Sequence, residues 1–184
     1  NTFALTRRMQ EQGLMAAIRG RVRAGVPYVG WSAGSNVCCP TICTTNDMPI
    51  VEPDSFRAIG AVKFQINPHY LDANPQGHAG ETREQRILEF IQANPRRWVV
   101  GLREGCMLHY EQGRLELVGS RPMRVFKKGL QPFEVEPGGD LSFRRVLFRS
   151  RTERRAVVLI INAYGFGIRD RRPRRAGRRG VSAA

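Results

Sequence analysis

The amino-acid sequence predicts an α/β protein with a partial doubly wound, mostly parallel sheet and a short antiparallel C-terminal part. Short β-prone apolar runs alternate with segments of helical periodicity, which is typical of βα units. A hairpin pattern follows them. The 184 residues are 41% hydrophobic and 25% charged, as in one soluble globular domain. No run of 18 apolar residues occurs, so we expect no transmembrane helix.

The N-terminal half is expected to contain two helices and two strands. Residues 2–24 place apolar side chains at helical spacing, which predicts a first helix. Residues 26–29 are a short apolar run between two glycines and predict a buried strand. A helix that begins near Ala33 would end or kink at Pro40. Residues 61–66 predict the second strand.

The C-terminal half is expected to contain one helix and several strands. Thr82, with Gln85 three residues later, has the pattern of a capping box, so a helix should begin there. That helix should stop before the Asn-Pro pair at residues 94–95. Strands are predicted at residues 98–102, 106–110, 114–118, 123–126 and 133–135, the second and third of them as a hairpin.

The net charge of +14 is concentrated near the C-terminal end. Residues 144–179 contain 13 Lys and Arg but only two acidic residues, for a net charge of +11. Residues 1–142 carry only +3, so any argument from basicity concerns the tail and not the domain. We therefore expect the folded domain within residues 1–142.

Residues 143–184 are expected to form a basic tail that is non-native or disordered. Residues 143–150 read like a translated sequencing-library adapter, which favours an assembly artefact. The arginine-rich segment at residues 171–179 cannot form a core. The apolar run at residues 156–163 is the one part of the tail that could form a strand.

Residues 30–34, Gly-Trp-Ser-Ala-Gly, match the G-x-S-x-G pattern of a nucleophile elbow. A strand is expected before them and a helix after them, which is the context that the pattern requires. The glycines permit the sharp turn that presents Ser32 as a nucleophile, and the backbone N–H of Ala33 would face a developing oxyanion. A serine-glycine turn without a catalytic role is the alternative.

A serine nucleophile needs a general base, and three histidines are available. His69 directly follows a predicted strand, so it should lie at the same sheet edge as the serine. His78 lies in a polar loop and His109 within a hairpin strand, which makes them weaker candidates. The acid that orients the base is either Glu104, at a strand end, or Asp47, in a turn. The sequence leaves both open, with Glu104 better placed.

The four cysteines do not have the spacing of a zinc site. Three of them, Cys38, Cys39 and Cys43, lie within six positions, and Cys106 is remote. We interpret them as small buried thiols in a reducing cytosol and expect a cytoplasmic protein. No metal site is predicted.

Five blocks of the chain carry a family pattern at matching spacing. They read GWSAGSN at residues 30–36, TTNDMPIV at 44–51, QINPH at 65–69, GETREQRI at 80–87 and GLREG at 101–105. Together they resemble the peptidase E family of α-aspartyl dipeptidases, and the resemblance covers about residues 1–142. It implies a glutamine-amidotransferase-like fold and a serine peptidase that removes N-terminal aspartate from short peptides, chiefly Asp-Xaa dipeptides, without metal or cofactor.

The resemblance also implies roles for individual residues. Ser32 matches the nucleophile and His69 the general base, while Asp47 and Glu104 both match acids proposed for the third role. Arg83 matches the arginine thought to bind the aspartate side chain of the substrate. The family's chain begins well before this one, with further βα units, so we expect an N-terminally truncated and inactive chain.

Two other functions remain as alternatives. A cyanophycinase-like peptidase of the same superfamily would also attack bonds next to aspartate. A nucleic-acid-binding protein acting through the basic tail is less favoured, because no basic face interleaved with aromatic residues occurs. No membrane partner is expected.

Overall fold

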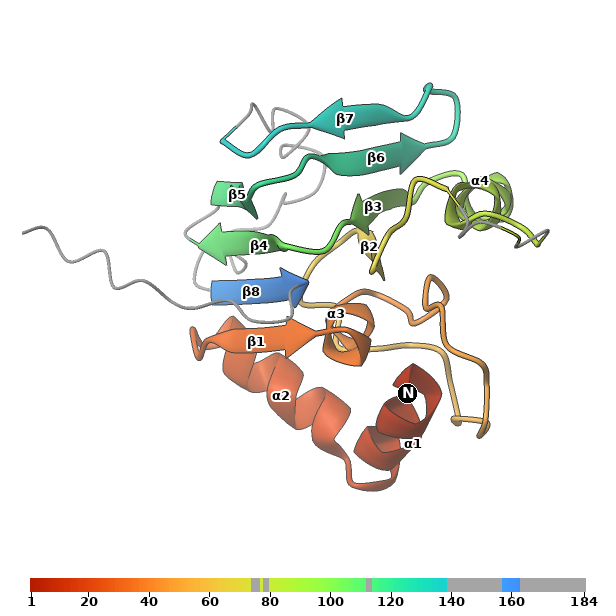
Figure 1. Cartoon of the computed structure of the whole chain (residues 1–184). Coiled ribbons are helices and arrows are strands. Elements are labelled where there is room, and N and C mark those ends of the chain that lie inside the picture. The colour runs from red at the N-terminus through yellow and green to blue at the C-terminus, as the bar shows by residue number, and fades with distance from the viewer. Residues whose placement is uncertain (74–76, 78–79, 112–113, 139–156, 163–184) are drawn as a thin grey trace, which may run out of the picture.

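The structure is a computed structural model that describes residues 1–73, 77, 80–111, 114–138 and 157–162 (Figure 1). The helices are α1 (Thr2–Glu11), α2 (Leu14–Arg23), α3 (Ala33–Val37) and α4 (Arg83–Ala93). The strands are β1 (Tyr28–Trp31), β2 (Gln65–Pro68), β3 (Trp98–Leu102), β4 (Cys106–Glu111), β5 (Arg114–Gly119), β6 (Met123–Lys127), β7 (Phe133–Val135) and β8 (Val157–Asn162). The predicted α/β class is confirmed.

The strands form two four-stranded sheets. One has the order β1-β8-β4-β5 and the other the order β2-β3-β6-β7. The parallel pairs are β1–β8 and β2–β3, whereas β4, β5, β6 and β7 pair in antiparallel fashion. The antiparallel part is therefore larger than expected. The strands β4 to β7 have only antiparallel neighbours, and β8 is parallel to β1 but antiparallel to β4.

The segment before β1 forms two helices where the sequence pattern predicted one. Gly13 separates them in a left-handed conformation, with φ 66° and ψ 13°, which a helix cannot contain. Met9 from α1 packs against Val37 and Ile59, whereas Val22 from α2 joins the core shared by the two sheets. Both helices thus lie at the end of the molecule that contains β1, opposite β7 (Figure 1).

The elements expected after residue 80 are confirmed almost residue for residue. Thr82 and Gln85 form the predicted capping box at the start of α4, and β3 has the predicted bounds. Ile87 and Ile91 of α4 pack with Val99 and Phe126 of the second sheet. The second predicted strand is displaced to Gln65–Pro68, because residues 61–64 form bends and not a strand, although Val62 and Phe64 are buried.

β8 lies beyond the expected domain boundary at residue 142 and takes part in the first sheet. It pairs with β1 on one side and β4 on the other, and Val158 and Ile160 are each 1% exposed (Figure 1). The apolar run of the tail therefore forms a strand, and the assignment of the tail as non-native stays a prediction. In the described ranges, no helix has both the length and the apolar composition needed to cross a membrane.

Candidate active site

Ser32 lies at the junction of β1 and α3 in a backbone conformation that side-chain-bearing residues rarely adopt. Its φ is 50° and its ψ −114°. Among the described residues other than glycine, only Ser32 and His69 have a positive φ. Such a conformation costs about 1–3 kcal/mol and persists where the surrounding structure imposes it, often at functional sites. The sharp turn agrees with the elbow expected from the G-x-S-x-G pattern.

The two glycines of the pattern are not equivalent. A Cβ at Gly30 would lie 2.8 Å from the carbonyl oxygen of Gly34 and 2.8 Å from ring atom Cε1 of Tyr28. A Cβ at Gly34 would meet only the Tyr28 hydroxyl, at 3.7 Å. Tyr28 donates this hydroxyl to the Gly34 carbonyl oxygen at 2.8 Å, and burial raises the pKa of the phenol. Only Gly30 is therefore required for the tight closure of the turn.

The hydroxyl of Ser32 is not used by its own helix. Ser32 occupies the N-cap position of α3 but makes no capping hydrogen bond. Within the described residues, this hydroxyl is not hydrogen-bonded to His69 either. In enzymes without bound substrate, the hydrogen bond between nucleophile and base is often long or absent. Ala33 begins α3, so its N–H has no acceptor inside the helix and can serve an external oxyanion.

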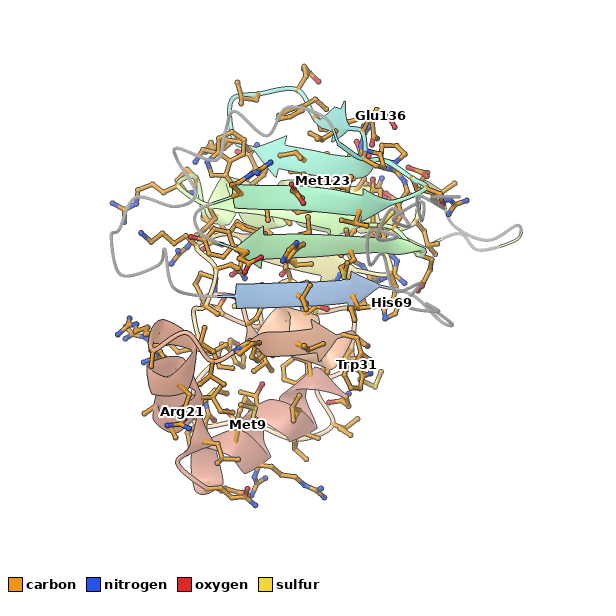
Figure 2. All side chains as sticks on the ribbon, turned by 90° about the vertical axis from the view of Figure 1, so that its left-hand side faces the viewer. Met9, Arg21, Trp31, His69, Met123 and Glu136 are labelled. Atoms are coloured by element: carbon orange, nitrogen blue, oxygen red, sulfur yellow. The ribbon has the colours of Figure 1, made fainter. Side chains whose placement is uncertain are left out.

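His69 and Glu104 are brought together by the pairing of β2 with β3. These strands are parallel neighbours with Pro68 opposite Leu102, so the residues that follow them share one sheet edge. Nδ1 of His69 contacts Oε1 of Glu104, and the two side chains are 33% and 39% exposed. His69 points to the same side of the molecule as Trp31, the residue before Ser32 (Figure 2).

The backbone before His69 is held by amide side chains from a neighbouring loop. Asn67 donates its Nδ2 to the carbonyl oxygen of Thr44 at 3.0 Å and to Oδ1 of Asn46 at 2.8 Å. Asn46 in turn donates its Nδ2 to the carbonyl oxygen of Pro68 at 2.8 Å. These bonds fix the chain where His69 takes its positive φ of 54°.

Asp47 contacts α1 and does not contact His69 in the described residues. Its Oδ2 accepts the backbone N–H of Thr2 at 2.5 Å, at the beginning of α1. Burial opposes ionisation of this carboxyl, but the hydrogen bonds from Thr2 hold the pKa of Asp47 below its usual value. Of the two acids left open by the sequence, Glu104 contacts His69, while Asp47 anchors its loop to α1.

Arg83 is the first residue of α4 and is half-buried. Burial, and then the charge of Arg86, lower the pKa of the Arg83 guanidinium. Within the described part of the chain, Arg83 has neither an ion pair nor a hydrogen bond from its side chain. A half-buried cation at the positively polarised start of a helix favours an anionic partner from outside the chain.

The other histidines and the cysteines lie apart from this edge. His109 on β4 is 3.5 Å from a carboxylate oxygen of Glu111 and 3.9 Å from one of Glu116. His78 lies outside the described residues. The cysteines are free thiols, and only Cys43 is exposed. In the described ranges, no three His, Cys, Asp or Glu side chains are grouped so as to hold a metal ion.

Sequence reasoning missed Arg103, which precedes Glu104. Its side chain is only 8% exposed and bonds to Asp72 and Glu134. These carboxylates raise the pKa of the Arg103 guanidinium, Glu134 most strongly. An arginine beside a candidate acid in the GLREG block was the available clue, but its partners are 31 residues away on either side and follow no spacing rule.

Comparison with known proteins gives one family and several relatives. The pattern of Peptidase family S51 matches residues 1–118. A protein named Peptidase E from Nostoc sp. is 50% identical over 143 residues, which are 78% of this chain and 59% of the relative. Proteins of the same name from Salmonella arizonae and Shewanella amazonensis are both 49% identical, over 75% and 77% of this chain and 60% of each relative. The chain thus spans about 60% of the length of these relatives.

Proposed function

The chain belongs to Peptidase family S51, and from this premise we propose that it forms part of a serine dipeptidase that releases N-terminal aspartate from Asp-Xaa dipeptides. The main support is the contact between His69 and Glu104, on the side of the molecule to which Trp31, the residue before Ser32, also points (Figure 2). The relatives named Peptidase E support the same activity.

In the proposed reaction, Ser32 is the nucleophile. Its Oγ attacks the carbonyl carbon of the scissile peptide bond while His69 takes the hydroxyl proton. The N–H of Ala33 donates to the resulting oxyanion. His69 then passes the proton to the leaving amine as the C–N bond breaks. Water next attacks the acyl carbon and gives a proton to His69, which returns it to Oγ of Ser32 as the ester C–O bond breaks.

Glu104 has the role of the third member in this proposal. Because its carboxylate contacts Nδ1 of His69, Nε2 is the nitrogen assigned to proton exchange with Ser32. The negative charge also stabilises the imidazolium that forms when His69 is protonated. The hydrogen bond of Asp47 to Thr2 supports a structural role for that residue instead.

Arg83 is the proposed recognition group for the substrate aspartate. A guanidinium offers two parallel N–H donors that match a carboxylate, and a buried carboxylate without a counter-charge would be costly. The half-burial of Arg83 and its lack of a partner within the described residues support this assignment. A cytoplasmic location, supported by the free thiols, completes the proposal.

The test uses the full natural reading frame that contains this chain. We expect it to hydrolyse Asp-Leu far faster than Asn-Leu or Leu-Leu, and Ser32→Ala to lower kcat by several orders of magnitude. A fluorophosphonate should modify Ser32 and stop hydrolysis. Preferential cleavage of a poly-aspartate–arginine polymer would favour the cyanophycinase-like alternative, and hydrolysis that survives Ser32→Ala would exclude the proposed nucleophile.

A further inference from the structure

Four charged side chains and one tyrosine form a connected ring, and three of them are sequence neighbours of candidate site residues. Tyr70 donates its hydroxyl to Oε2 of Glu84 at 2.9 Å. Arg124 holds both carboxylate oxygens of Glu84, at 2.8 and 3.1 Å, and donates to Oε1 of Glu134 at 3.0 Å. Arg103 holds both oxygens of Glu134, at 2.7 and 2.9 Å, and its guanidinium carbon lies 5.4 Å from the ring centre of Tyr70. We call these five residues the charged ring.

The ring joins elements that are distant in sequence. Glu84 comes from α4, Arg124 from β6 and Glu134 from β7, while Arg103 follows β3. Arg103 also contacts both carboxylate oxygens of Asp72 and donates to the carbonyl oxygen of Pro122 at 2.7 Å. Both arginines therefore make two-pronged pairs, whose geometry is more restrictive than that of single hydrogen bonds.

Three members of the ring are sequence neighbours of three candidate site residues. Tyr70 follows His69, Glu84 follows Arg83, and Arg103 precedes Glu104. Tyr70 is 1% exposed and packs with Ile87 and Val99, so its ring cannot shift without disturbing the core. A displacement of any of these three ring members would therefore move the adjoining site residue.

We propose that the charged ring is a positioning device that sets His69, Glu104 and Arg83 at fixed separations from one another. The inference rests on the proposed function, because it assigns these three residues to one reaction. Arg103 links the strand end at Glu104 to Tyr70 beside His69, and Arg124 and Glu84 link α4, which begins with Arg83, to the same sheet. The ring thereby couples the catalytic pair to the substrate-binding arginine.

Glu134 is the most informative position for a test. It bridges both arginines, is remote from the site in sequence, and is 34% exposed, and Glu134→Gln keeps the shape and a hydrogen-bond acceptor while it removes the charge. Glu116→Gln on β5 is the matched control, because Glu116 pairs with exposed Arg114 at 3.2 Å outside the ring. We expect Glu134→Gln to lower kcat for Asp-Leu by about 10- to 100-fold, since small misplacements of reacting groups have effects of this size. The control should be unchanged.

Three further variants separate positioning from general stabilisation. Arg103→Met should slow both Asp-Leu hydrolysis and fluorophosphonate labelling of Ser32. Arg103→Lys keeps the positive charge but loses the two-pronged donor geometry of the guanidinium, so it should recover only part of the labelling rate. Arg124→Met should mainly raise KM for Asp-Leu relative to Asn-Leu. A structural role alone would lower the melting temperature of these variants and leave the labelling rate and the substrate ratio of the folded protein unchanged, which would overturn the proposal.

Two readouts keep this test independent of the proposed substrate. If the wild-type protein is labelled at Ser32 but does not cleave Asp-Leu, the proposed function fails, and the labelling rates still decide the role of the ring. If neither reaction occurs, the ¹⁵N resonances of the His69 ring test whether the charged ring positions this side chain. They should shift in Glu134→Gln and not in Glu116→Gln, and identical spectra for both variants would overturn the proposal.

Discussion

His69 and Glu104 meet across two parallel strands, at positions one and two residues beyond the strand ends. The pairing places Pro68 opposite Leu102, and the backbone N–H of Tyr70 donates to the carbonyl oxygen of Leu102 at 3.0 Å. Backbone hydrogen bonds between β2 and β3 therefore fix the chain next to both His69 and Glu104. The orientation of the imidazole is set by the same pairing that builds the core, and it does not depend on a flexible loop.

The first prediction compares the two candidate acids in the full natural reading frame. Glu104→Gln should lower kcat for Asp-Leu by about 10³–10⁴-fold, because the amide no longer stabilises the imidazolium form of His69. Asp47→Asn should lower kcat by less than about tenfold, because Asp47 bonds to Thr2 and not to His69. Steady-state kinetics measure both. A large loss of kcat in Asp47→Asn, together with a nearly normal kcat in Glu104→Gln, would reverse the assignment.

Asp47 gives a second prediction, on stability and pH. The pKa of Asp47 is lowered in the folded protein from its ordinary value of 3.8, so its ionised form stabilises the fold. This contribution is complete above the unfolded-state pKa and is lost as the pH falls through the folded-state pKa. Asp47→Asn should therefore cost less than about 1 kcal/mol at pH 7, because solvent screens this partly exposed carboxylate, and the cost should disappear in strong acid. Urea unfolding between pH 7 and pH 2.5 measures it, and a cost that is constant with pH would contradict this account.

The third prediction separates the two glycines of the elbow. Gly30→Ala should destabilise the protein by about 1–3 kcal/mol, because its methyl group would overlap the Gly34 carbonyl oxygen and the Tyr28 ring. Gly34→Ala should be neutral or slightly stabilising, because space exists and alanine favours a helix. Urea unfolding of both variants is sufficient. Equal losses would mean that the turn tolerates neither side chain.

The local elements and the contact between His69 and Glu104 were largely predictable from the sequence, but the strands before Ser32 and His69 belong to different sheets and do not share the expected edge. The capping box at Thr82 and the strand at residues 98–102 depend on neighbouring residues only, so short-range rules find them. His69 and Glu104 were placed at strand ends, and parallel pairing then brought them together. The break at Gly13 was missed because apolar side chains recur on both sides of it at helical spacing.

Long-range partners were not predictable in this way. Arg103 bonds to carboxylates 31 residues before and after it, and no periodicity encodes such distances. The position of β8 between β1 and β4 also depends on pairing between remote segments. The sequence indicated only that residues 156–163 are apolar enough to form a strand, and the sheet determines where that strand lies.

The fourth prediction concerns β8 in the present chain. Ile160 is 1% exposed between β1 and β4, so Ile160→Ala should destabilise the protein by about 2–4 kcal/mol. Leu159, half-buried on the same strand, should cost clearly less when changed to alanine. Denaturant unfolding compares the two. If neither substitution has an effect, and ending the chain at residue 142 has none, the tail is not part of the folded domain.

The last prediction uses Arg83 and Arg86, two arginines on one helix with different surroundings. Arg83 is half-buried without a partner in the described residues, whereas Arg86 is exposed and pairs with Glu81 at 3.5 Å. If Arg83 binds the aspartate side chain, Arg83→Ala leaves that carboxylate unpaired and should lower kcat/KM for Asp-Leu by roughly 2–5 kcal/mol. Asn-Leu lacks the charge and should lose much less, so the preference for Asp-Leu should collapse. Arg86→Ala should change neither substrate, because exposed ion pairs contribute little. Proportional losses on both substrates in Arg83→Ala would assign Arg83 a structural role, because Asp-Leu differs from Asn-Leu at this position by the negative charge that Arg83 is proposed to bind.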